Sequence, residues 1–426
     1  MKHQHLARIA AAVAVAASAN GHALQAADAT RSWRFDFASG PALPGWTQVA
    51  PETTYSAERG FGFDLGSKVE AVNRGGNDPL RDAFVTAAKP FYFSVALPEG
   101  NYEVAVTFGD RLAGSTNTVK AESRRLMLER VVTKPGEFVT RLFTVNIRTP
   151  AIPGGSPVRL KDREQGALHW DDKLTLELNG ARPALCAVEI KPAPKATTVY
   201  LLGDSTVTDQ PSEPWNSWGQ MLPRFFEPGV AVANHAESGE SLRSSLNARR
   251  VEKVLRSLQS GDYVLIQFGH NDQKDKSADA LANFQKSLTQ LVAAVRARGA
   301  APVLIASMER KAGARNPTLG DYPDAVRAVA RDEGVPFINL QRMSQALYVA
   351  LGPDLDRAFV DGTHHNAYGS YELARCVVEG LRQNNLPLAQ MLTDDLPMFD
   401  PRKPDPVNGF SVPASPQVSE TKPEGN

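Results

Sequence analysis

Cysteine is almost missing from this sequence, which has only Cys186 and Cys376 among its 426 residues. Two cysteines cannot form the disulfide framework of a small secreted domain, although a single bridge between them remains open. The chain also lacks any group of cysteines and histidines with the spacing of metal ligands. We therefore expect no metal site and no cofactor.

An excess of charge of either sign is missing too. The 47 basic residues are balanced by 47 acidic residues, and no block rich in lysine or arginine stands out. Proteins that bind nucleic acids carry a basic surface that neutralises phosphates. The balance predicts that nucleic acid is not a partner of this chain.

Long apolar runs are missing after the first residues, where Ile9 to Ala17 is apolar. This run is shorter than the ~20 residues that a membrane-spanning helix needs, so we expect no membrane partner. A basic start precedes it, and small residues follow near Ala23 and Ala26. This order is typical of a secretory signal peptide. We predict a signal peptide over residues 1–26 and a secreted or periplasmic protein.

Residues 29–192 show the pattern of an antiparallel β-sandwich. Short strand-like segments alternate with turn signals, and no long amphipathic helix interrupts them. The expected strands are Trp33–Phe37, Phe91–Leu97, Tyr102–Phe108, Phe138–Ile147 and Lys173–Leu178.

The pattern changes after the proline-containing linker Lys191–Lys195. In residues 197–390, short apolar runs suited to a buried parallel sheet alternate with segments whose apolar residues recur at helical spacing. This alternation predicts a flavodoxin-like α/β/α domain. A proline-rich tail follows over residues 391–426, and we expect it to be disordered from about Val418.

Three short blocks in the second domain contain the residue types of a serine ester hydrolase. A serine hydroxyl is a weak nucleophile, so it needs a positioned base and a partner that holds the tautomer of that base. The charge that develops on the carbonyl oxygen needs preorganised N–H donors. Because each block follows a predicted strand, we expect the blocks to meet at one edge of the sheet. They are Gly203-Asp204-Ser205-Thr206, Gly269-His270-Asn271-Asp272 and Asp361-Gly362-Thr363-His364.

These blocks resemble those of the SGNH (GDSL-like) hydrolase superfamily, and most closely those of rhamnogalacturonan acetylesterases, over about residues 197–385. The resemblance implies that Ser205 is the nucleophile, His364 the general base and then acid, and Asp361 its orienting partner. It also implies an oxyanion hole formed by the backbone N–H groups of Ser205 and Gly239 and the side-chain amide of Asn271.

One position departs from the pattern of pectin-directed relatives, which typically carry arginine where this chain has Glu240. This departure weakens the case for an acidic galacturonate substrate.

Four further residues near the blocks have open roles. Trp215 and Trp218 are candidates to wall the substrate cleft, with core packing as the alternative. His270 is a candidate to line the site, or else to support the turn at Asn271. His365 adjoins the expected base, but the spacing from Asp361 favours His364, and we expect His365 to be a loop or helix-cap residue.

The first domain resembles the galactose-binding-like jelly-roll domains found beside carbohydrate esterases. Its aromatic residues are candidates for a sugar-stacking surface, although large rings in a β-sandwich more often form the core. The likeness rests on Phe35-Asp36-Phe37, Pro44-Gly45-Trp46 and Tyr55 to Phe63, and the candidate aromatic residues are Trp46, Tyr55, Phe61, Phe63 and Trp170.

Together these features predict a serine-dependent carbohydrate acetylesterase whose partner is an acetylated polysaccharide or oligosaccharide of the plant cell wall, with rhamnogalacturonan or other pectin first. A xylan acetylesterase, a GDSL-type lipase and a non-catalytic carbohydrate-binding protein are the alternatives. The sequence leaves the oligomeric state open.

Overall fold

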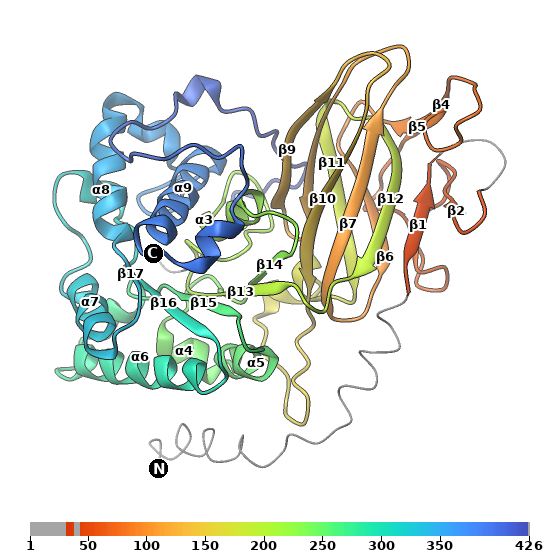
Figure 1. Ribbon diagram of the computed structural model, residues 1–426. Helices are drawn as coiled ribbons and strands as arrows, with labels where there is room; N and C mark the ends of the chain where they lie inside the picture. Colours follow the sequence, from red (N-terminus) through yellow and green to blue (C-terminus); the bar gives the residue numbers. More distant parts are fainter. Residues whose placement is uncertain (1–30, 38–42, 425–426) are drawn as a thin grey trace.

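A computed structural model describes residues 31–37 and 43–424, which form a β-sandwich followed by an α/β domain (Figure 1). The expected signal peptide at residues 1–26 lies outside the described residues. The two predicted fold classes are confirmed, and the domains are packed side by side (Figure 1).

The β-sandwich consists of a seven-stranded and a five-stranded sheet. Alternate residues of its strands are buried, as in β7, where Tyr102, Val104, Val106 and Phe108 lie in the core between the sheets. This period of two is what one buried face requires. The strands are β1 (Trp33–Asp36), β2 (Thr47–Gln48), β3 (Phe61–Asp64), β4 (Glu70–Asn73), β5 (Ala83–Thr86), β6 (Phe91–Ala96), β7 (Gly100–Gly109), β8 (Ser115–Ala121), β9 (Arg125–Thr133), β10 (Phe138–Ile147), β11 (Lys173–Arg182) and β12 (Leu185–Pro192).

Strand β8 shows why part of this domain was not predicted. Its sequence has no apolar alternation, yet most of it is buried, including Ser115, Asn117 and Lys120. Asn117 Nδ2 donates to Ser115 Oγ at 2.8 Å and to the carbonyl of Val131 at 3.0 Å. Buried polar residues whose hydrogen bonds are satisfied inside the protein leave no hydrophobic signal in the sequence.

The α/β domain has a parallel sheet in the order β14-β13-β15-β16-β17, which is the flavodoxin-like order. Helices α4 to α7 pack on one face of this sheet, and α3, α8 and α9 pack on the other. The strands are β13 (Thr197–Leu202), β14 (Val230–Asn234), β15 (Tyr263–Ile266), β16 (Ala301–Ile305) and β17 (Phe337–Ile338). The helices are α3 (Trp218–Met221), α4 (Leu242–Asn247), α5 (Arg250–Ser257), α6 (Ala280–Arg296), α7 (Tyr322–Glu333), α8 (Leu340–Leu351) and α9 (Ala367–Gln383).

The strand order places the site. The connection from β13 leads to β14 on one side, and β15 pairs with β13 on the other, so the chain changes direction at the carboxyl end of β13. Such a switch point opens a crevice beyond the strand ends. Ser205 follows β13 directly and therefore stands at this crevice.

A buried polar interface joins the two domains. Arg125 of β9 donates from Nε to Asp209 Oδ2 at 2.7 Å, and the two side chains are 1% and 0% exposed. Gln220 Nε2 donates to the carbonyl of Ser123 at 2.6 Å. The β-sandwich thus braces the segment that follows Ser205.

The proline-rich tail crosses from the α/β domain to the β-sandwich and then returns toward the α/β domain, as the dark-blue trace in Figure 1 shows. Lys120 Nζ donates to the carbonyl of Pro413 and to Ser415 Oγ, each at 2.7 Å. Val418 pairs with Glu213 in a parallel bridge. The expectation of disorder from about Val418 is therefore wrong for residues up to 424, because both domains supply hydrogen-bond partners that the local sequence does not reveal.

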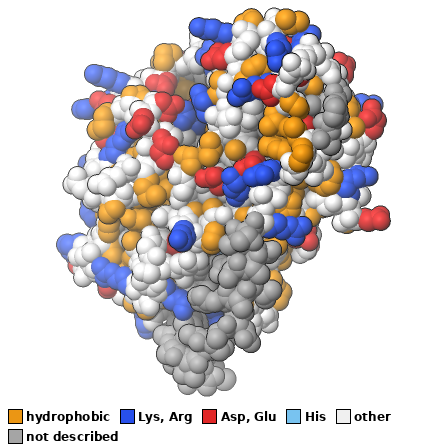
Figure 2. All heavy atoms as spheres, turned by 45° about the vertical axis from the view of Figure 1, so that its right-hand side comes forward, with side chains coloured by type: hydrophobic (Ala, Val, Ile, Leu, Met, Phe, Trp, Pro, Cys, Tyr) orange, Lys and Arg blue, Asp and Glu red, His pale blue; other side chains and the backbone are white. Residues whose placement is uncertain are grey.

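Both cysteines are buried and unpaired, so the bridge that the sequence left open is not formed. Cys186 lies in β12 and Cys376 in α9, each within the core of its own domain. Among the described helices, none is long and apolar enough to cross a membrane. Basic and acidic side chains are interspersed on the face that Figure 2 shows.

Candidate active site

The turn after β13 fixes Ser205. A β-carbon on Gly203 would lie 2.6 Å from Val207 Cγ2 and 2.9 Å from the carbonyl oxygen of Gln267, so the chain passes too tightly for any other residue. Asp204 Oδ1 accepts hydrogen bonds from the backbone and hydroxyl of Thr206 at 2.9 and 2.8 Å. These contacts hold the serine in one backbone conformation at the end of the strand.

Ser205, His364 and Asp361 form one hydrogen-bonded line. His364 Nε2 lies 2.9 Å from Ser205 Oγ, and His364 Nδ1 lies 2.9 Å from Asp361 Oδ2. Ser205 is 2% exposed and His364 1%. The serine and the histidine are 159 positions apart in the sequence, so the fold brings them together.

Asp361 is suited to remain charged. Burial by itself would raise the pKa of this carboxyl, but hydrogen bonds from the side chain and backbone of His364 and the backbone of Thr363 outweigh burial and lower the pKa well below its usual range. The backbone donors lie at 2.6 Å for Thr363 and 2.7 Å for His364, both to Oδ1. Lys422 Nζ of the tail lies 3.3 Å from Oδ2.

The candidate oxyanion donors surround the serine block on neighbouring elements. Gly239 follows β14 with φ +79°, a conformation that glycine adopts without strain. Among the described residues, no acceptor is bonded to the backbone N–H of Ser205 or of Gly239. Asn271 Nδ2 donates to the carbonyl of Glu240 at 3.0 Å, and the amide carries a second N–H.

The peptide that carries the Gly239 N–H is held by the β-sandwich. The carbonyl of Ser238 belongs to the same peptide unit, and it accepts from Lys161 Nζ at 2.5 Å and from Arg163 Nη2 at 2.7 Å. The C=O and N–H of a trans peptide point in opposite directions. Fixing the carbonyl on one side therefore aims the Gly239 N–H to the other.

Three of the four residues with open roles are buried side chains that pack around the site. Trp218 is 0% exposed, donates from Nε1 to Gln267 Oε1 at 2.8 Å and lies in the core, so the expectation that it walls the cleft is wrong. His270 is also buried, and its Nε2 lies 2.7 Å from the carbonyl of Met308, a backbone contact beyond the end of β16. His365 packs on the ring of Phe359, and burial lowers its pKa to about 3, which keeps it neutral.

Trp215 is the fourth, and it lies beside the reacting groups. Its ring meets that of His364 edge to face at 5.7 Å, and its Nε1 donates to the carbonyl of Ser419 in the tail at 2.9 Å. Trp215 therefore remains a candidate to contact substrate.

The aromatic residues of the β-sandwich do not form one stacking surface. Phe63 and Trp170 are buried, and the ring of Phe61 packs against Phe35 in the core. Trp170 lies under the guanidinium of Arg148, 4.6 Å from its ring centroid.

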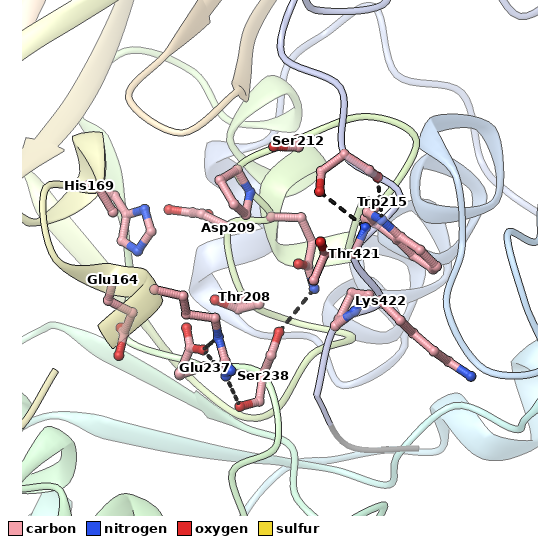
Figure 3. Close-up of a pocket in the computed structure, with 16 residues that line it drawn as sticks. Glu164, His169, Thr208, Asp209, Ser212, Trp215, Glu237, Ser238, Thr421 and Lys422 are labelled. Atoms are coloured by element: carbon pink, nitrogen blue, oxygen red, sulfur yellow. Dashed lines mark hydrogen bonds and ion pairs between the residues drawn. The ribbon is translucent and has the colours of Figure 1, made fainter. Parts of the chain in front are cut away.

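A pocket of about 200 Å³ lies beside the hydrogen-bonded line, between the two domains and the tail. Figure 3 shows Glu164 and His169 of the β-sandwich on one side, Glu237 and Ser238 below, and Trp215 with Thr421 and Lys422 on the other side. Ser205 and His364 are buried and are not among its lining residues, and the ring of Trp215 packs against that of His364. Ser205 and His364 are thus shielded from solvent, and the pocket is an open space next to them.

Three contributors were missed by sequence reasoning. Gln210 donates from Nε2 to the carbonyl of Ser205 at 2.7 Å, and its place five residues after the serine was the only available hint. Lys161 and Arg163 are in the other domain, in an ordinary charged segment, so no sequence signal marks them. Among the described residues, no group of three or more His, Cys, Asp or Glu side chains could hold a metal ion.

Comparison with known proteins agrees with this geometry. Residues 201–370 match the GDSL-like lipase/acylhydrolase family, and residues 33–140 match the galactose-binding-like domain of β-agarases and YxiM-type esterases. Rhamnogalacturonan acetylesterase RhgT of Bacillus subtilis is 38% identical over 220 residues, which are 46% of this chain and 95% of that protein. The chain belongs to the GDSL-like lipase/acylhydrolase family. It is thus an esterase by family, with a galactose-binding-like domain before the hydrolase.

A second relative spans both domains of this GDSL-like hydrolase. The uncharacterised esterase YxiM of Bacillus subtilis is 27% identical over 372 residues, which are 83% of this chain and 91% of that protein. Its solved structure aligns with a TM-score of 0.45 at 25% identity, covering 84% of this chain and 99% of that one.

Proposed function

We propose that this GDSL-like hydrolase is an exported carbohydrate acetylesterase that removes O-acetyl groups from rhamnogalacturonan or related pectin. The observation that carries the proposal is the continuous line from Ser205 Oγ through His364 to Asp361, with 2.9 Å at each step. The similarity to RhgT supports the sugar class, because that relative is a rhamnogalacturonan acetylesterase. The basic and apolar pattern of residues 1–26 supports export.

The reaction proceeds by two acyl transfers. Ser205 Oγ attacks the acetyl carbonyl while its proton passes to His364 Nε2, and the charge on His364 is balanced by Asp361. The oxyanion accepts hydrogen bonds from the N–H groups of Ser205 and Gly239 and from the second N–H of Asn271. His364 then gives its proton to the departing sugar oxygen. Water, deprotonated by His364, attacks the acetyl-serine and releases acetate.

Acetate release tests the proposal. Wild type and Ser205→Ala are compared on acetylated rhamnogalacturonan and acetylated xylan, with Ser212→Ala, an exchange of the same type at the pocket rim, as the matched control. We expect serine-dependent release from rhamnogalacturonan, several orders of magnitude lower in Ser205→Ala. Release from xylan alone contradicts the pectin assignment. A preference for long-chain p-nitrophenyl esters with no acetate from either polymer contradicts the acetylesterase assignment as a whole.

A further inference from the structure

Two basic side chains of the β-sandwich reach the edge of the catalytic site. Lys161 precedes the short helical turn Asp162–Glu164 and Arg163 lies within it, and both contact the Ser238 carbonyl beside Gly239. Their side chains remain 28% and 37% exposed. They are thus cations next to an expected oxyanion donor, with part of their surface open to a ligand.

The chain places its own carboxylate on these cations. Glu424 in the tail makes an ion pair with Arg163 Nη1 and lies 3.3 Å from Lys161 Nζ. A β-carbon built on Gly239 would lie 3.0 Å from Glu424 Oε2. The Glu424 carboxylate therefore occupies the space between the two cations and the glycine of the candidate oxyanion hole.

Two nearly buried carboxylates pair with the cations and leave part of each cation exposed. Glu240 lies 3.3 Å from Lys161 Nζ. Glu237 accepts from Arg163 Nε at 2.9 Å and Nη2 at 2.6 Å. Both carboxylates are nearly buried, at 3% and 6% side-chain exposure, whereas Glu424 is 60% exposed. The buried pair positions the cations, and Glu424 is the partner that a ligand can replace.

We propose that Lys161 and Arg163 form a binding site for the carboxylate of an acidic sugar, which Glu424 of the tail occupies when substrate is absent. This proposal rests on the proposed function, because a pectin substrate carries the carboxylates that the two cations would bind. In such a site the tethered Glu424 carboxylate competes with the ligand, because tethering gives it a high effective concentration. Binding of a uronate then requires that the end of the tail move away.

Direct binding to the full chain carrying Ser205→Ala tests the site without turnover. The ligands are an unacetylated galacturonate-containing oligosaccharide and a neutral galacto-oligosaccharide of the same length, and calorimetry gives both dissociation constants. We expect Arg163→Gln to weaken the acidic ligand relative to the neutral one by about ten- to hundredfold, the range for a hydrogen bond between ions. Arg159→Gln is the matched control, because Arg159 is an exposed cation of the same segment.

A substitution in the tail should change the affinity for the acidic ligand in the opposite direction. Glu424→Gln removes the charge of the competitor, so we expect the acidic ligand to bind severalfold more tightly. Glu420→Gln, an exposed glutamate of the same tail, is the control. Equal affinity for the two ligands in the parent overturns the proposal. An equal loss of affinity for both ligands in Arg163→Gln also overturns it, because such a loss indicates that Arg163 only positions the Ser238 peptide. Unchanged affinity for the acidic ligand in Glu424→Gln overturns it as well.

Failure of the two proposals can be told apart. Binding of the acidic ligand is measured on a chain that lacks the nucleophile, so it does not depend on esterase activity. Serine-dependent acetate release together with no preference for the acidic ligand overturns the carboxylate site and leaves the acetylesterase standing. A preference for the acidic ligand with no acetate release from any polymer contradicts the acetylesterase instead.

Discussion

Replacing Asp361 by asparagine should disable the site through the tautomer of His364. Asp361 Oδ1 accepts backbone N–H groups of Thr363 and His364 at 2.6 and 2.7 Å, so the asparagine oxygen takes that place and its NH2 faces His364 Nδ1. Nδ1 must then accept, and the proton resides on Nε2. An Nε2 that already carries a proton cannot take the proton of Ser205, 2.9 Å away.

The expected loss follows from this geometry. A histidine held in the wrong tautomer lowers kcat by roughly 10⁴ in serine hydrolases, which is about 5.5 kcal/mol in the activation free energy. The assay is kcat and KM for p-nitrophenyl acetate across pH 5 to 10, with thermal unfolding as a check on the fold. Asp354→Asn is the matched control, because Asp354 is half exposed and its ion pair with Arg357 lies at the surface. A kcat for Asp361→Asn within tenfold of wild type refutes the reasoning.

Two further predictions concern stability. Arg125→Met leaves Asp209 buried with its main charge partner removed, and we expect a loss of about 3–5 kcal/mol in the free energy of unfolding by urea. Exposed Arg141→Met is its control, and equal losses in the two variants contradict the prediction. Burial, with the charge of Asp204 adding, raises the pKa of Asp272 to about 7. The folded state therefore holds a proton that the unfolded state releases near pH 4, so this carboxyl costs stability as pH rises from 4 to 7. Asp272→Asn removes that dependence. The unfolding free energy of the variant should therefore rise relative to that of wild type between pH 5 and pH 8. Parallel pH curves for the two proteins contradict the prediction.

Periodicity was a good guide where one face of an element is apolar. Strand β10 has the predicted bounds Phe138–Ile147, and the apolar repeat of α6 packs on the parallel sheet as expected. It failed where burial is polar, as in β8, and where long-range partners decide order, as in the tail beyond Val418. Local sequence reports local preferences, whereas Lys120 of β8 and Val418 of the tail are held by groups more than a hundred residues away.

The sequence by itself determined which residues are candidates for the chemistry of this esterase. The residue types and spacing of three blocks predicted Ser205, His364 and Asp361 as the reacting groups, because a nucleophile, a base and an orienting acid are each needed and few side chains can serve. Only the tertiary structure decided what surrounds them. It buried Trp218 and His270, brought Lys161 and Arg163 from the other domain to the Gly239 peptide, and laid Glu424 against both cations. Such contacts depend on how separate domains pack, and packing between distant segments leaves no periodic trace along the chain.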